Sequence, residues 1–294
     1  MVLSTLVLRS HRPTAPVTWA ISGDSADVDT LSRWAKEFDV EIRRSPAKVP
    51  TPPGAVGGRW RTAMFVRFRD IHGVAHAHKS DDLVHVENDT FFLGDPSHYL
   101  GRINQSRRYA IGLNRERPPE PNAGWLHPDE YHCNEAVVYM PGTIEARAVS
   151  MMVVSTLYAA TFGGFGAEDI GALSGRLNQW GEGRVTSEEV HETIARMVPD
   201  RVARLPLVPW VPMSDPSEEG NDIERLGVVH MSRWSAKFAR EYGGECKWAL
   251  AEDQVFARAI MAAGRHWPEL VRTLPRLSDC LAVGKMRQST SYTA

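Results

Sequence analysis

Two acidic side chains, Glu87 and Asp89, follow a short apolar run and have the chemistry to bind a metal ion. The run, residues 83–86, reads as a buried strand of an α/β sheet. Residues two apart in an extended chain point to the same side, so both carboxylates face one way. Ligands of open α/β sheets bind at the carboxyl ends of strands, and hard divalent cations prefer oxygen ligands. The pair is therefore interpreted either as a cation site or as a solvated turn.

Three further polar groups lie at the ends of predicted elements. One precedes a strand-like run, one opens a predicted helix, and a histidine ends a predicted strand. These residues are Asn134 with Glu135, Glu168 with Asp169, and His230. A helix dipole alone favours acidic residues in a first turn, and a histidine at a strand end can be purely structural. Each group therefore has a structural as well as a functional interpretation.

The elements that must position these residues begin as strand, helix, strand. Strands are predicted over 17–22 and 40–43, with an amphipathic helix over 26–38 between them. This order is typical of a parallel sheet with right-handed crossovers. Further strands are predicted over 83–86, 109–113 and 226–231, and further helices over 60–68, 144–160 and 186–197. The segment with His72, His76 and His78 reads as a loop; no cysteine or acid joins it locally, so a metal site there is not favoured.

Composition indicates a globular protein whose net charge does not favour binding to a polyanionic partner. The chain has 294 residues, 43% apolar and 24% charged, with a net charge of −2, so no global field attracts nucleic acid or anionic membrane. Three widely spaced cysteines favour a reducing, cytoplasmic location. No apolar stretch approaches about 18 residues, so no membrane span is predicted.

Together with the acidic pair, these three groups make four polar motifs. Their order along the chain resembles that of the motifs in the nucleotide-sugar-dependent glycosyltransferases of the GT-A fold. The strongest resemblance is to the family of glycogenin and the bacterial lipooligosaccharide galactosyltransferases. That family has an acid-x-acid metal motif at a strand end, an Asn-Ala-Gly-type segment, an Asp-Gln helix start and a late metal-binding histidine. The matching segments here are Glu87-Asn88-Asp89, Asn134-Glu135-Ala136, Glu168-Asp169 and His230. The family also has an arginine on the helix before the metal motif, a position that Arg67 occupies.

The resemblance implies a fold, a domain organisation and a reaction. The implied fold is α/β: a Rossmann-like, mixed and mostly parallel sheet flanked by helices over residues 1–240. A helical C-terminal extension over 241–294 is expected to pack on the same domain. The implied reaction is the metal-dependent transfer of a sugar from a nucleoside diphosphate sugar, with UDP-sugar the favoured donor, to a hydroxyl acceptor.

The resemblance also implies a role for each residue of the site. The metal, Mn²⁺ or Mg²⁺, would be held by Glu87, Asp89 and His230. The donor would be bound by Arg67, Asn88, Asn134, Glu135 and Lys237. Glu168 and Asp169 would be catalytic, as a general base if the enzyme inverts the anomeric centre and as a stabilising or nucleophilic group if it retains it.

Two rival functions remain open at this level. A nucleotidyltransferase would need a glycine-rich loop with Arg and Lys after the first strand, and none is visible. Two departures from the family favour a non-catalytic binding protein of the same fold. Position 87 is a glutamate where the family motif has an aspartate, and the family's first strand is missing or reduced. The acceptor is open as well: a glycan, a protein, a lipid head group or a modified nucleic-acid base fits equally.

Overall fold

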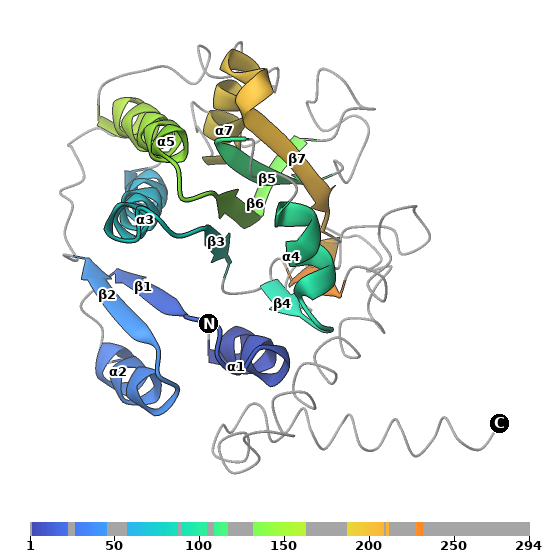
Figure 1. The fold of residues 1–294 in the computed structure, drawn as a ribbon. Coiled ribbons are helices and arrows are strands. Elements are labelled where there is room, and N and C mark those ends of the chain that lie inside the picture. Colours follow the sequence, from blue (N-terminus) through green and yellow to red (C-terminus); the bar gives the residue numbers. More distant parts are fainter. Residues whose placement is uncertain are drawn as a thin grey trace, which may run out of the picture. The chain divides into compact units, whose positions relative to one another are not determined.

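The computed structural model describes nine segments of the chain, in which helices and strands are interspersed along the sequence (Figure 1). The described residues are 2–22, 27–45, 58–87, 90–104, 109–116, 132–162, 187–208, 210–211 and 227–231. The chain divides into two compact units: the larger unit comprises 16–86 and 102–205, and the smaller unit comprises 1–15, 87–101 and 206–294. The predicted boundary at residue 240 and the predicted helical extension over 241–294 lie outside the described residues.

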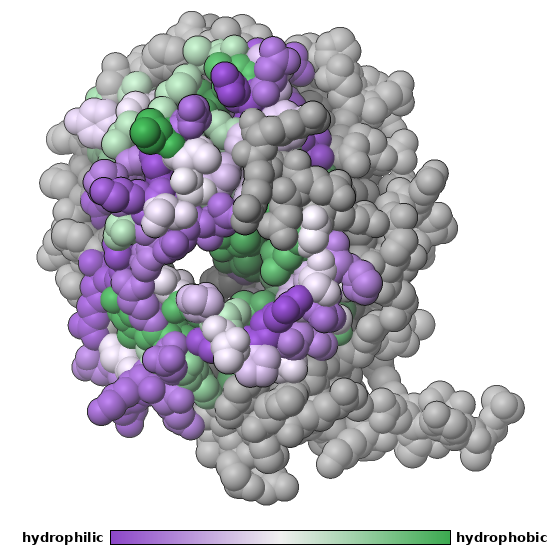
Figure 2. All heavy atoms as spheres, viewed as in Figure 1, coloured by the Kyte–Doolittle hydropathy of each residue, from purple (hydrophilic) through white to green (hydrophobic). Residues whose placement is uncertain are grey.

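The larger unit opens with a parallel strand pair joined by a helix, as the sequence predicts. β1 (Thr18–Ser22) and β2 (Glu41–Ser45) are parallel and in register, and α2 (Asp27–Glu37) connects them. The turn after α2 places Asp39 at a φ of 52°, a left-handed conformation that short polar side chains tolerate. The exposed positions of α2 carry charged side chains, and hydrophilic residues gather over this helix (Figure 2).

The main sheet of the larger unit has four strands in the order β3-β6-β5-β7. They are β3 (Leu83–Val86), β6 (His132–Met140), β5 (Ile111–Glu116) and β7 (Val202–Leu207). β6 is antiparallel to both of its neighbours, β3 and β5. The α/β class with mixed sheets is confirmed, but the main sheet is not mostly parallel as expected, because β6 is antiparallel to both of its neighbours.

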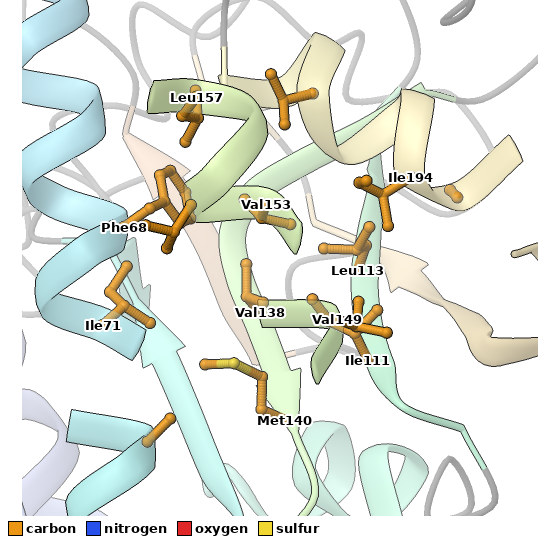
Figure 3. Packing of buried hydrophobic residues seen from close by; sticks show 14 of the residues in the cluster. Phe68, Ile71, Ile111, Leu113, Val138, Met140, Val149, Val153, Leu157 and Ile194 are labelled. Carbon is orange, nitrogen blue, oxygen red and sulfur yellow. The ribbon is translucent and has the colours of Figure 1, made fainter. Parts of the chain in front are cut away.

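Three helices, α3 (Gly58–Ala77), α5 (Ile144–Phe162) and α7 (Ser187–Met197), provide much of the buried core, with α5 in contact with both others. A short 3₁₀ turn, Pro199–Arg201, follows α7. The core gathers apolar side chains of these helices and of β5 and β6 (Figure 3). They include Phe68, Ile71, Ile111, Leu113, Val138, Met140, Val149, Val153, Leu157 and Ile194.

The prediction that the helix over 60–68 ends in a histidine-containing loop is wrong, because α3 continues to Ala77. Its buried face continues through Phe68, Ile71 and Ala75, which keep helical spacing against the core. Gly73 lies at an exposed position in this stretch. A single exposed glycine costs a helix only about 1 kcal/mol relative to alanine, and packing of the opposite face outweighs that cost.

The turn between β6 and α5 lies directly against the turn that follows α3. The Gly142 amide donates a hydrogen bond to Asp82 Oδ1 at 3.0 Å, and Tyr139 Oη donates to Asp82 Oδ2 at 3.0 Å. A Cβ atom on Gly142 would lie 2.4 Å from the carbonyl oxygen of Ser80. Because both sides of this contact are backbone, no side-chain rotation relieves the clash.

Two glycine-to-alanine substitutions in the larger unit should therefore act in opposite directions. Gly142→Ala is expected to lower the free energy of unfolding by about 2 kcal/mol, because the turns must separate. Gly73→Ala should raise it by about 0.5–1 kcal/mol, since nothing lies within 4 Å of its Cβ position and alanine favours helix. Urea unfolding of both variants measures the two values. A stable Gly142→Ala protein would contradict the packing of these turns.

The smaller unit contains a three-stranded sheet in the order β4-β9-β8, and α1 packs on β4. Its elements are α1 (Val2–His11), β4 (Thr90–Phe92), α4 (Ser97–Asn104, which begins in this unit), β8 (Trp210–Val211) and β9 (Val228–Met231). β4 and β9 are antiparallel, with Thr90 opposite His230, and β8 and β9 are parallel. Ser4 Oγ donates to the Thr90 carbonyl at 2.7 Å and so fastens α1 to β4. Within the described ranges, no helix has the length and apolarity needed to cross a membrane.

Candidate functional site

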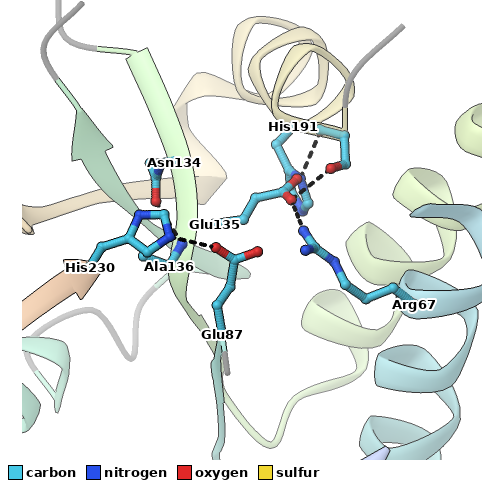
Figure 4. A network of polar contacts seen from close by, with 8 residues as sticks. Arg67, Glu87, Asn134, Glu135, Ala136, His191 and His230 are labelled. Atoms are coloured by element: carbon cyan, nitrogen blue, oxygen red, sulfur yellow. Dashed lines mark hydrogen bonds and ion pairs between the residues drawn. The ribbon is translucent and has the colours of Figure 1, made fainter. Parts of the chain in front are cut away.

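The predicted site residues that the structure describes form two polar groups, one in each unit. Figure 4 labels members of both. The group in the smaller unit is Glu87 with His230, and the group in the larger unit surrounds Glu135. The predicted residues Asn88, Asp89, Glu168, Asp169 and Lys237 lie outside the described residues, so their roles stay predictions.

The structure brings Glu87 and His230 together. His230 Nε2 lies 3.1 Å from Glu87 Oε2 (Figure 4). The contact follows from the local backbone: the Thr90 amide, at the start of β4, donates to the Glu87 carbonyl at 3.0 Å. β4 then pairs with β9 so that Thr90 is opposite His230. The two residues that sequence reasoning assigned to one metal site therefore meet through strand pairing.

This pair fits a divalent cation in chemistry and in spacing. Two neighbouring ligands of an octahedral ion, each about 2.1 Å from it, lie about 3.0 Å apart, close to the spacing of these two atoms. A carboxylate together with an imidazole suits Mn²⁺. Mg²⁺ is the alternative, although it is a harder cation with a stronger preference for oxygen ligands. Glu87 is 18% exposed, so the pair is reachable from solvent. Among the described residues, no group of three or more His, Cys, Asp or Glu is arranged for a metal, and the predicted third ligand, Asp89, lies outside them.

The second group is a buried carboxylate with three donors from two helices. Glu135 lies on β6; Ser187 Oγ donates to its Oε2 at 2.7 Å, and His191 Nδ1 lies 2.7 Å from its Oε1. Arg67, on α3, forms an ion pair with Oε2 (Figure 4). Glu135 and His191 are only 1% and 2% exposed. Every donor to this carboxylate therefore comes from within the protein.

An irregular stretch of β6 presents Glu135 to the helices. The pairing of β5 with β6 shifts register between Leu113 and Asn114, and Asn114 pairs with Asn134. Asn134 Oδ1 accepts a hydrogen bond from the Ala136 amide at 2.7 Å, within this irregular stretch. Sequence reasoning assigned Asn134 and Glu135 to the donor, and the structure places both side chains in buried positions with internal partners.

The charge state of this network follows from its contacts. Burial by itself would raise the pKa of Glu135, but the positive charge of Arg67, followed by the charge and hydrogen bond of His191 and the hydrogen bond of Ser187, holds that pKa below its ordinary value. The carboxylate is therefore ionised at neutral pH. His191 Nδ1 also lies 3.0 Å from the Ser187 carbonyl oxygen. Carboxylate and carbonyl oxygens only accept, so Nδ1 carries a proton.

Ser187, His191 and Glu135 have the residue types of a catalytic triad but not its arrangement. In a triad the serine hydroxyl contacts the imidazole nitrogen that faces away from the acid. Here Ser187 Oγ donates to the carboxylate itself, and all three side chains are at most 2% exposed. The network therefore orders Arg67 and α7; it does not activate a nucleophile.

Sequence reasoning missed Ser187 and His191 as partners of Glu135. It used the segment around Ser187 only as a helix-capping signal. The one available signal was the spacing of four residues between Ser187 and His191, which places both on one face of a helix. That spacing does not tell which face is buried or which strand it meets.

These elements define an α/β protein with mixed sheets. No protein-family model matches the chain, and no curated protein matches it in sequence. The fold is similar to that of the galactosyltransferase LgtC, solved in complex with donor and acceptor sugar analogs. The match covers 90% of each chain, with a TM-score of 0.48 and 9% sequence identity. A likeness at this level indicates neither a shared ligand nor a shared reaction, so any function must be argued from the residues.

Proposed function

We propose that the protein is a metal-dependent glycosyltransferase that moves a sugar from a nucleoside diphosphate sugar to a hydroxyl acceptor. The contact between Glu87 and His230, at 3.1 Å, is the observation that carries this proposal. These residues are far apart in the sequence, and the resemblance to the GT-A glycosyltransferases assigns both of them to one metal. Their meeting supports that assignment, because a turn formed by solvated charges would not require a distant histidine.

The roles of the residues follow from the chemistry of the transfer. The bond between the anomeric carbon and the diphosphate oxygen breaks, and its electron pair leaves with the diphosphate, while the acceptor oxygen forms the new bond. Mn²⁺ or Mg²⁺ would be held by Glu87, His230 and Asp89, and it would supply positive charge to the leaving diphosphate. If the enzyme inverts the anomeric centre, Glu168 or Asp169 would take the proton of the acceptor hydroxyl; if it retains it, one of them would stabilise the positive charge of the sugar or act as a transient nucleophile. Arg67, Asn88, Asn134 and Lys237 are the proposed contacts of the donor, with UDP the favoured nucleotide.

A thermal-shift measurement with UDP, GDP and their sugars, each with and without Mn²⁺, tests this proposal. A ligand at a hundredfold its dissociation constant should stabilise the folded protein by about 2.7 kcal/mol. We expect one nucleotide to do so, and only when the metal is present. Transfer of the sugar to water or to an added acceptor then separates an enzyme from a binding protein of the same fold.

Substitutions of the two contacting residues make the test specific. His230→Ala and Glu87→Gln should each weaken the Mn²⁺-dependent binding by at least about tenfold. His98→Ala is the matched control, because His98 is an exposed histidine at the start of α4 in the same unit. Metal-dependent binding that is unchanged in His230→Ala would rule out this pair as the metal site.

A further inference from the structure

Two histidines of α3 lie on one face of the helix. His72 and His76 are four residues apart, and α3 continues through both of them to Ala77. Side chains at this spacing lie one above the other on a helix. The centroids of the two rings are 6.4 Å apart, and the rings are stacked with an interplanar angle of 24°. The pair is thus a product of the helix, and it has no counterpart in the loop that the sequence predicts here.

A hydroxyl of the neighbouring helix contacts one nitrogen of His72. Ser150 Oγ, on α5, lies 3.0 Å from His72 Nδ1. A hydroxyl can accept as well as donate, so it can accept a hydrogen bond from an Nδ1–H group. That tautomer leaves the lone pair of Nε2 available to a metal ion, and metal-bound histidines commonly donate their other nitrogen to a nearby oxygen. Since Ser150 is buried, this contact ties the ring of His72 to the core.

The second ring has the freedom to complete a chelate. His76 is exposed, and exposed side chains change rotamer rapidly. Zinc binds imidazole nitrogens at about 2.1 Å in tetrahedral geometry, which puts two ligand nitrogens about 3.4 Å apart and the centroids of their rings about 5 Å apart. The observed separation of the centroids is 6.4 Å. A small rotation of His76 therefore brings the two rings to the spacing that a shared ion requires.

The surrounding charges are compatible with a cation. Arg147 places a positive charge near His72, but its Nη2 donates to the carbonyl oxygens of His78 and Asp81, at 3.0 Å each. The negative charges of Asp82 and Asp81 act on the same guanidinium. In the described part of the chain, no three His, Cys, Asp or Glu side chains converge on a metal position. The pair would therefore hold an ion through two nitrogens, with water in the other positions.

We propose that His72 and His76 form a further metal site, which binds a transition-metal ion such as Zn²⁺ across one turn of α3. Two histidines four residues apart on a helix face are a known arrangement of zinc ligands. Imidazole suits Zn²⁺, Ni²⁺ and Cu²⁺, whereas Mg²⁺ prefers oxygen. Gly73 lies within the bridged turn, and glycine weakens a helix, so the ion would reinforce α3 at this point. The site lies within the larger unit and does not depend on the proposed function.

Calorimetric titration of the whole chain with Zn²⁺ tests this inference. Two linked ligands bind an ion more tightly than either one alone, because the second nitrogen binds at a high effective concentration. We therefore expect His72→Ala and His76→Ala each to weaken Zn²⁺ binding by about a hundredfold. The double substitution should weaken it little further, since either change removes the chelate. Zn²⁺ should also raise the thermal midpoint of the wild type, but not that of His76→Ala.

Moving one histidine by a single position gives the matched control. His76→Ala combined with Ala77→His keeps the number of histidines but places the two rings on different faces of the helix, so this variant should bind Zn²⁺ as weakly as His76→Ala. His230→Ala should retain the binding, because His230 belongs to the smaller unit. Since His76 is exposed, its variants keep the test available if His72→Ala fails to fold.

The outcomes decide the inference without reference to any nucleotide. Tight Zn²⁺ binding that survives both His72→Ala and His76→Ala overturns it, and so does wild-type affinity in the variant with the shifted histidine. Ser150→Ala should weaken Zn²⁺ binding by about tenfold, because the partner of His72 Nδ1 is lost. An unchanged affinity in Ser150→Ala would show two ordinary surface histidines and would overturn the proposed site. Failure of the glycosyltransferase proposal would leave all these results standing.

Discussion

Replacing Glu135 by alanine should lower the free energy of unfolding by about 3–5 kcal/mol, which is typical when one partner of a buried ion pair is removed. Glu135 is 1% exposed and is the common acceptor for Arg67, Ser187 and His191. Without the carboxylate, those donors lose their shared acceptor, and a cavity opens between β6 and the helices. Burying unsatisfied polar groups and opening a cavity are both costly.

Urea unfolding of three variants tests this explanation. Glu135→Gln keeps the shape of the side chain but exchanges one acceptor oxygen for a donor. We therefore expect it to lower the free energy of unfolding, but by less than Glu135→Ala does. Glu145→Ala is the control, because Glu145 is an exposed glutamate in the first turn of α5, and its removal should change stability by at most about 0.5 kcal/mol. Equal stabilities of Glu135→Ala and Glu145→Ala would show that the network contributes nothing to folding.

The order of the elements could be predicted where periodicity is clear. The strand, helix and strand over β1, α2 and β2 follow from apolar spacing, and their parallel pairing follows from the crossover rule. The antiparallel pairing of β6 could not be predicted, since a strand pattern carries no direction. The extension of α3 beyond Phe68 was missed because Gly73 and three nearby histidines read locally as a loop, whereas burial of the opposite face decides the conformation.

The candidate site could be predicted only in part, for a related reason. Glu87 and His230 could be assigned to one metal because their types and order resemble those of the GT-A glycosyltransferases, in which an acid at a strand end and a late histidine bind the metal. Glu135 was assigned to the donor because Asn134-Glu135-Ala136 matches the Asn-Ala-Gly-type segment of that family, and the sequence alone does not show that Glu135 is buried. Its pairing depends on side chains of α3 and α7, and only the packed structure brings Arg67 and His191 to it.

Acid should remove the contribution of Glu135 to stability. The folded state holds the pKa of this carboxyl below its ordinary value of 4.5, against the effect of burial, through the charges of Arg67 and His191. A group whose pKa is lowered by folding binds fewer protons in the folded state than in the unfolded state at acidic pH. Its contribution is therefore fully present above the ordinary pKa and is lost as the pH falls below that value through the folded pKa.

The difference in unfolding free energy between wild type and Glu135→Gln isolates this group from the other carboxyls, because those titrate in both proteins. The difference should be constant from pH 8 to about pH 6, and it should shrink steadily below about pH 4.5, the ordinary value for a glutamate. The reason is that a protonated Glu135, like glutamine, no longer has two accepting oxygens or a negative charge for Arg67. A difference that stays constant down to the acid unfolding of the protein would mean that Glu135 is not ionised in the folded state, and the charge assignment of the whole network would then be wrong.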